Sequence, residues 1–257
     1  MSWVWAGARA IGTAHLAQGL PCQDAFQCRI WQEGAHPPVL IAALADGAGS
    51  VVHAEVGAQL ATSVVADIVG ERLIEGTAHD QVAALLRYAI DEARSALEVK
   101  AGHDRCVIDD YACTLLVAIL SANGGIVGQI GDGAVVIDAG EQSWRPVHWP
   151  EHGEYANTTR FLTDPDALEA LQMATLEQPV RRVCLFSDGL ERLVLDFRDR
   201  SAHAPFFDAI FRPLDAHAEG GHAADISRGL EALLASDKIN SRTDDDKSLL
   251  CAALRAG

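Results

Sequence analysis

The pattern of apolar and polar positions divides the chain into strand-length and helix-length segments. Short, nearly continuous apolar runs predict buried strands at Val39–Ala45, Tyr111–Leu120, Ile126–Ile130, Ala134–Asp138, Arg182–Phe186 and Ser248–Ala253. Apolar residues at helical spacing predict helices at Glu55–Ile74, Asp80–Val99 and Ala223–Leu234. Each long helix has polar positions along one side, which indicates a solvent-facing surface.

The order of these segments indicates a mixed α/β (α+β) fold. Two consecutive helices stand between strand groups, and closely spaced strands follow, which favours antiparallel pairing over regular βαβ alternation. No repeat, low-complexity tract or linker interrupts residues 1–257, so we expect one domain. Two stretches lack clear periodicity. Gly140–Asp164 is predicted to be a long surface excursion, and Ser201–Gly221 to be irregular.

Composition narrows the class of protein further. The 257 residues are 49% hydrophobic, enough for a sizeable core, yet no apolar run reaches the roughly 18 residues typical of a membrane helix. The N-terminus lacks a basic region followed by an apolar stretch, so we expect no secretory signal and a cytoplasmic location. None of the six cysteines forms a C-x-x-C pair, which predicts small buried hydrophobes in a reducing compartment rather than a zinc site.

The charge of the chain bears on its partners. A formal net charge of −16 repels nucleic-acid backbones and anionic lipid, so we expect neither nucleic acid nor membrane as a partner. The same acidity suits a protein that collects divalent cations. Most of the 36 acidic residues are nevertheless expected to form ordinary solvated surface.

Aspartates recur where the predicted strands end, beside glycine. Asp46-Gly47 follows the run that ends at Ala45, Asp132-Gly133 follows Ile130-Gly131, and Asp188-Gly189 follows Phe186-Ser187. The run Asp244-Asp245-Asp246 comes just before the last strand. A single Asp-Gly is more often a turn than a ligand, because both residues suit turn geometry. Several carboxylates converging on one place would repel one another unless a hard cation neutralised them, so the set predicts a metal site.

The order and flanks of these motifs resemble the protein phosphatase 2C (PPM) family, the metal-dependent serine/threonine phosphatases. The resemblance rests on Gly12-Thr13-Ala14-His15, Pro21-Cys22-Gln23-Asp24-Ala25, Ala45-Asp46-Gly47-Ala48-Gly49, Ala112-Cys113-Thr114, Ile130-Gly131-Asp132-Gly133, Phe186-Ser187-Asp188-Gly189 and Asp245-Asp246-Lys247-Ser248. Ala-Asp-Gly-Ala-Gly-Ser and Gly153-Glu154-Tyr155-Ala156-Asn157 are similar to a compact bacterial branch of the family. The resemblance implies a four-layer sandwich of two central antiparallel β-sheets flanked by α-helices.

The resemblance also implies a metal site and its ligands. Asp46 would bridge two Mn²⁺ or Mg²⁺ ions, with the carbonyl of Gly47 as a further ligand, and Asp188 and Asp245 would complete the pair. Asp24 would hold metal-bound water. Asp132, together with Asp188, matches positions used for a third, weaker ion, and a structural turn explains Asp132 equally well.

The implied reaction is hydrolysis of phosphoserine or phosphothreonine by a hydroxide that bridges the two metals. No cysteine or serine nucleophile is then needed, so Ser187 and Ser50 are expected to be turn hydroxyls. The partners implied are a phosphorylated protein substrate and a companion serine/threonine kinase.

The sequence departs from the family pattern at the groups that would handle the substrate. Gly19 stands where animal members have a phosphate-binding arginine, and Arg9 is the nearest arginine upstream. Ala48 stands where some members have a histidine that protonates the leaving group. His15 and His53 are the nearest replacements, and His15 is the better catalytic candidate.

The end of the motif series departs too. Asp246 and Ser248 replace the usual asparagine and threonine, and the run of three aspartates leaves the register of Asp245 open by one position.

Two other functions remain open on the sequence alone. The same fold could serve as a non-catalytic regulatory or binding module, because the arginine and histidine are missing. It could also be a phosphoesterase for small molecules, because only the rim of the site would differ. The excursion Gly140–Asp164 falls where the family has its variable flap, and we expect it to select substrates.

Overall fold

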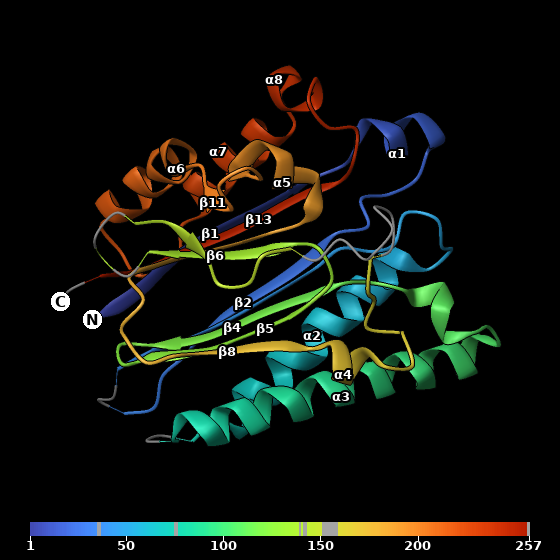
Figure 1. The fold of residues 1–257 in the computed structure, drawn as a ribbon, viewed down its shortest axis with the longest axis horizontal. Helices are drawn as coiled ribbons and strands as arrows, with labels where there is room; N and C mark the ends of the chain where they lie inside the picture. The colour runs from blue at the N-terminus through green and yellow to red at the C-terminus, as the bar shows by residue number, and fades with distance from the viewer. Residues whose placement is uncertain (35–36, 75–76, 139, 141–142, 151–158, 256–257) are drawn as a thin grey trace.

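The computed structural model describes residues 1–257 except 35–36, 75–76, 139, 141–142, 151–158 and 256–257. Two β-sheets pack face to face, with helices on both outer sides (Figure 1). The six-stranded sheet has the order β12 (Gly221–His222), β1 (Ser2–Ala10), β13 (Lys247–Arg255), β9 (Arg182–Phe186), β6 (Ala134–Asp138) and β7 (Arg145–Pro146). The five-stranded sheet has the order β2 (Ala25–Trp31), β3 (Val39–Ala45), β4 (Leu115–Ser121), β5 (Gly124–Ile130) and β8 (Gln172–Leu176).

Strand pairing in the described residues is antiparallel except for the short parallel contact between β1 and β12. A separate two-stranded ribbon joins β10 (Leu195–Asp196) to β11 (Ser201–Ala202). The helices are α1 (Thr13–Gln18), α2 (Ala54–Arg72), α3 (His79–Asp104), α4 (Ala167–Ala170), α5 (Asp188–Val194), α6 (Ala204–Ala216), α7 (Ala224–Leu234) and α8 (Asp237–Asn240), with a 3₁₀ turn at Ile108–Tyr111. The predicted class, antiparallel sheets flanked by helices, is confirmed.

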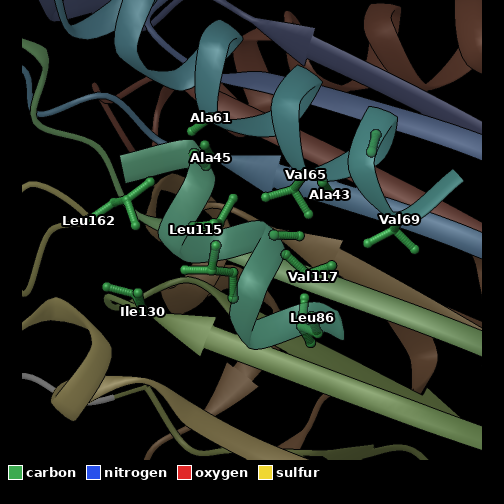
Figure 2. Packing of buried hydrophobic residues seen from close by; sticks show 14 of the residues in the cluster. Ala43, Ala45, Ala61, Val65, Val69, Leu86, Leu115, Val117, Ile130 and Leu162 are labelled. Atoms are coloured by element: carbon green, nitrogen blue, oxygen red, sulfur yellow. The ribbon is translucent and has the colours of Figure 1, made fainter. Parts of the chain in front are cut away.

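Three apolar layers hold the sandwich together. Between the sheets, alternate residues of β3, β4 and β13 form the central core, including Leu40, Leu116 and Leu250. Below the five-stranded sheet, α2 and α3 bury their apolar faces, and Val65, Leu86 and Val117 meet there (Figure 2). Above the six-stranded sheet lie α5, α6 and α7. Because β3 and β4 are covered on both faces, they are apolar throughout, which is why continuous runs predicted them.

The long helices follow their sequence pattern closely. Buried residues of α3 recur three or four positions apart, at Val82, Leu86, Ala89, Ile90, Ala93, Leu97 and Ala101. The helix ends at Asp104, because the next residue, Arg105, has a left-handed φ of 61° that stops helical hydrogen bonding. Fully burying one leucine such as Leu86 stabilises the fold by about 1.5–3 kcal/mol.

Some boundaries differ from the sequence-based expectation. The irregular structure expected over Ser201–Gly221 is wrong for its middle, which forms α6. Its apolar residues Phe207, Ile210, Phe211 and Leu214 have helical spacing, and a proline at the start of a helix costs no hydrogen bond. The run Tyr111–Leu120 becomes a strand only from Leu115. Part of the expected excursion 140–164 lies outside the described residues, and Trp144 within it is buried against α6.

Candidate active site

The strand register brings the motif aspartates to one end of both sheets. In the five-stranded sheet, Ala25 pairs with Ala45, so Asp24 and Asp46 flank the same end of β2 and β3. In the six-stranded sheet, Leu249 pairs with Phe186, so Asp188 follows β9 where Asp245 precedes β13. The carboxylates therefore come from the ends of separate strands rather than from one loop, and the strands beside Asp46, Asp188 and Asp245 are buried.

Asp24 is the most deeply buried of these groups, with no exposed surface. The hydroxyl of Ser187 donates a hydrogen bond of 2.8 Å to its Oδ2 atom. Its Oδ1 atom receives no hydrogen bond from the described residues. Burial raises the pKa of Asp24 to about 7, with the charge of Asp246 adding to the rise.

Asp46, Asp188 and Asp245 act on one another electrostatically. Burial raises the pKa of Asp46 well above its ordinary value, and the charges of Asp24, Asp188 and Asp245 raise it further. Burial also raises the pKa of Asp188 to about 6, and its Oδ1 atom is buried without a hydrogen-bond partner in the described residues. Carboxylates repel one another in this way only when their charges are close, so the predicted convergence is present.

Asp132 follows the end of β5 and is 6% exposed. The hydroxyl of Thr159 donates a hydrogen bond to its Oδ2 atom. Its charge contributes to the raised pKa of Asp188. The charges of Asp132 and Asp188 also add to the burial that raises the pKa of Glu191 to about 8. The charge of Asp132 thus acts on the acidic cluster, which Glu191 on α5 extends.

The glycines beside the aspartates are required by close backbone packing. A Cβ atom on Gly47 would lie 2.7 Å from the carbonyl oxygen of Ala54, and one on Gly189 only 1.9 Å from that of Asp246. These two glycines therefore make room for neighbouring backbone, which holds Asp46 and Asp188 in register with the other strands.

The run of three aspartates divides into different environments. The carboxylate of Asp246 points inward and accepts hydrogen bonds from the backbone N–H groups of Gly12 (2.6 Å) and Gln23 (2.5 Å) and from His15. Burial raises the pKa of Asp245, whose charge acts on Asp46 and Asp188. Asp245 is therefore the member of the run that acts on Asp46 and Asp188, whereas Asp246 acts on Asp24.

His53, His15 and Arg9, the remaining residues considered for binding or protonating the substrate, lie in different surroundings. His53 stacks on Tyr111 with ring centroids 4.9 Å apart, as a structural histidine does. His15 is 8% exposed and paired with Asp246. The guanidinium of Arg9 donates a hydrogen bond of 2.7 Å to the carbonyl oxygen of Asp24, so it supports the backbone beneath the site.

Three residues inside the quoted motifs support the site in ways that the motifs did not predict. The Thr114 hydroxyl accepts the N–H of Asp46 at 3.0 Å. Lys247 has no exposed surface and donates to the carbonyl oxygen of Asp245 at 2.9 Å. Ser187, expected to be a turn hydroxyl, also accepts the N–H of Ser248 at 3.0 Å, so it ties Asp24 to β13. The contacts of Thr114 and Ser187 join residues far apart in sequence, so no local spacing reveals them.

The chemistry of the cluster suits a hard divalent cation. Buried carboxylate oxygens without hydrogen-bond donors, on Asp24 and Asp188, are the oxygen ligands that Mg²⁺ and Mn²⁺ prefer. The side chains do not form a closed cage: no group of three or more His, Cys, Asp or Glu among the described residues is arranged to hold an ion by itself. Backbone carbonyls and waters would have to complete the coordination, as is usual for Mg²⁺.

The motif carboxylates thus lie at one end of a two-sheet sandwich. Comparison with known proteins gives the class. A model of the family described as "Protein phosphatase 2C" matches residues 11–235. The curated "Serine/threonine-protein phosphatase 3" of Escherichia coli (strain K12) is 38% identical over 254 residues, 98% of both chains. The chain belongs to the protein phosphatase 2C family and is a phosphatase by membership.

Solved structures agree with this fold. PppA of Pseudomonas aeruginosa, titled a key regulatory component of T6SS, superposes with a TM-score of 0.65 at 16% identity, covering 98% of both chains. The catalytic domain of the serine/threonine phosphatase PstP, in complex with two manganese ions, gives a TM-score of 0.62 at 18% identity and the same coverage. The described residues include no helix long and apolar enough to cross a membrane.

Proposed function

We propose that this protein removes phosphate from phosphoserine and phosphothreonine side chains of proteins, using two Mn²⁺ or Mg²⁺ ions. The observation that carries the proposal is the mutual electrostatic coupling of Asp24, Asp46, Asp188 and Asp245 at one end of the sandwich. The 38% identical relative is named a serine/threonine-protein phosphatase, which supports this substrate class.

Each residue has a defined task in this proposal. Asp46, the Gly47 carbonyl, Asp188 and Asp245 would hold the two ions. Asp24, buried and held by Ser187, orients water beside them. When bound, two such ions lower the pKa of coordinated water so that hydroxide is available near neutral pH, and they stabilise charge on the phosphoryl oxygens.

Further parts of the proposal concern the edges of the site. Asp132 and Glu191, whose charges interact, provide a weaker third position beside Asp188. The segment 140–164 selects substrates, and a serine/threonine kinase supplies the phosphorylated protein. A cytoplasmic location is supported by the six cysteines, all of which are free.

The test is hydrolysis of an aryl phosphate, a phosphothreonine peptide and a nucleotide, each with Mn²⁺, with Mg²⁺ and with a chelator. We expect metal-dependent turnover that prefers the peptide and is lost in Asp46→Ala. The control is Asp91→Ala, which removes an exposed aspartate of α3 and should have no effect. Preference for the nucleotide would instead indicate a small-molecule phosphoesterase.

A second candidate is a regulatory module of the same fold. It is favoured by Gly19 and Ala48, which occupy the positions of the family's arginine and histidine, and by the open arrangement of the carboxylates. Titration calorimetry separates the two functions. Binding of Mn²⁺ without turnover on any of the three substrates would refute the phosphatase proposal and support the regulatory module.

A further inference from the structure

A histidine–carboxylate pair lies beside the acidic cluster. The Nδ1 atom of His15, in α1, is 2.9 Å from Oδ2 of Asp246. Asp246 is 1% exposed and also receives the backbone N–H groups of Gly12 and Gln23, so three donors fix its position. The orientation of the His15 ring is thereby fixed as well, because one ring nitrogen is tied to an immobile carboxylate.

The other ring nitrogen faces the loop that carries Asp46. Among the described residues, Nε2 of His15 has no hydrogen-bond partner. A Cβ atom on Gly49 would lie 3.2 Å from Nε2, so the absence of a side chain there keeps the nitrogen accessible. Gly49 itself is exposed, and the charge of His15 acts on Asp245. Nε2 thus lies between the Asp46 loop and the start of β13.

We propose that Asp246 is a positioning residue for His15, and that Nε2 of His15 donates a proton to the departing oxygen of the substrate. The inference rests on the proposed phosphatase function. As the ester P–O bond breaks, its electron pair stays on the alkoxide oxygen, which takes the Nε2 proton. The neutral ring keeps Nδ1–H on Asp246 and regains the second proton from water.

The carboxylate at position 246 suits this task better than the asparagine of the family pattern. A buried carboxylate both orients an imidazole and offsets the charge of its doubly protonated form. The two oxygens of Asp246 accept three N–H donors, whereas asparagine has one acceptor oxygen and an NH₂ group that would face a donor. Proton donation matters for serine and threonine esters because an alkoxide is a poor leaving group.

The experiment compares two substrates that differ in leaving group, a phosphothreonine peptide and 4-nitrophenyl phosphate, with Mn²⁺ present. His15→Asn keeps an amide near Nδ1 to bond Asp246 and removes the group at Nε2. We expect kcat/KM to fall about 10²-fold for the peptide and less than about 10-fold for the aryl ester, which departs without protonation. Asp246→Asn should change kcat/KM in the same way as His15→Asn, with the larger loss for the peptide.

The matched control is His103→Asn. His103 also has Nδ1 2.9 Å from a carboxylate oxygen, that of Asp104, but its ring is 84% exposed on α3. This variant should leave kcat/KM unchanged for both substrates. Equal losses on both substrates, or no loss, in His15→Asn would overturn the inference while leaving the phosphatase intact. If His15→Asn does not fold, the same comparison of the two substrates in Asp246→Asn tests the inference. Absence of metal-dependent turnover in the unmodified protein would refute the proposed function and the inference with it.

Discussion

Replacement of Gly189 by alanine should separate the two strand ends that carry Asp188 and Asp245. The new Cβ atom would lie 1.9 Å from the carbonyl oxygen of Asp246, whereas real Cβ contacts essentially never fall below 3.0 Å. The obstacle is backbone, so no side chain can turn away. The start of α5 and the start of β13 must therefore move apart by about 1 Å.

Two magnitudes follow from that displacement. Overpacking of a tight core site costs about 1–3 kcal/mol in free energy of unfolding, and a backbone obstacle places Gly189→Ala toward the upper end. A misplacement of about 1 Å in a catalytic group costs on the order of 10²-fold in rate. We therefore expect both a lower Tm and a kcat/KM about 10²-fold lower with Mn²⁺.

The control is Gly229→Ala in α7, where a new Cβ atom meets nothing within 4 Å. That substitution should stabilise the protein by up to about 1 kcal/mol, because alanine is the better helix former, and leave turnover unchanged. Thermal unfolding and calorimetric Mn²⁺ titration measure both variants. Unchanged Mn²⁺ affinity and turnover in folded Gly189→Ala would show that Asp188 and Asp245 need not keep this register, and the ligand set proposed here would be wrong.

Three further predictions concern the acidic cluster and its support. Because the pKa values of Asp188 and Asp24 are raised to about 6 and 7, their stabilising contribution is present below about pH 4 and is lost as pH rises through those values. The Tm of the metal-free protein should fall as pH rises over that window, and Mn²⁺ should raise Tm more at pH 8 than at pH 5. A Tm that does not change with pH would contradict this. Ser187→Ala removes the hydroxyl bonded to Asp24 and should cost about 1–3 kcal/mol in urea unfolding. Asp138→Ala removes a buried carboxylate that accepts hydrogen bonds from Arg182 and from the N–H of Gly140. It should cost about 1–3 kcal/mol without changing turnover per folded molecule, because Arg182 keeps its ion pair with Asp215, and urea unfolding and the phosphatase assay measure both effects.

Several strands and the long helices were predictable because burial decides where their apolar residues stand. Val39–Ala45 and Ala134–Asp138 were predicted with the bounds observed, since strands buried on both faces leave an unbroken apolar run. β1, β2 and β8 were missed because they mix polar with apolar residues, and β2 and β8 also lie at the edges of the five-stranded sheet. α6 was missed because its two prolines obscured a regular apolar spacing.

The motifs predicted the aspartates of the candidate site but not the contacts that position them. The Asp-Gly pairs located Asp46 and Asp188, but nothing in the local sequence connects Ser187 with Asp24, 163 positions away. The pairing of His15 with Asp246 spans 231 positions and exists only once β1 and β13 are paired. Long-range contacts of this kind depend on strand register, which is a property of the whole fold.

The same construction explains how the protein tolerates its acidic cluster. Carboxylates whose pKa values are raised by burial and mutual repulsion make the metal-free, ionised state less stable near neutral pH. The fold holds Asp24 and Asp188 in place regardless, because Asp24 precedes β2, which pairs with the buried strand β3, and Asp188 follows the buried strand β9. Cations that bind only the folded state would recover that stability by mass action. Metal affinity and folding stability should therefore change together in variants of the cluster.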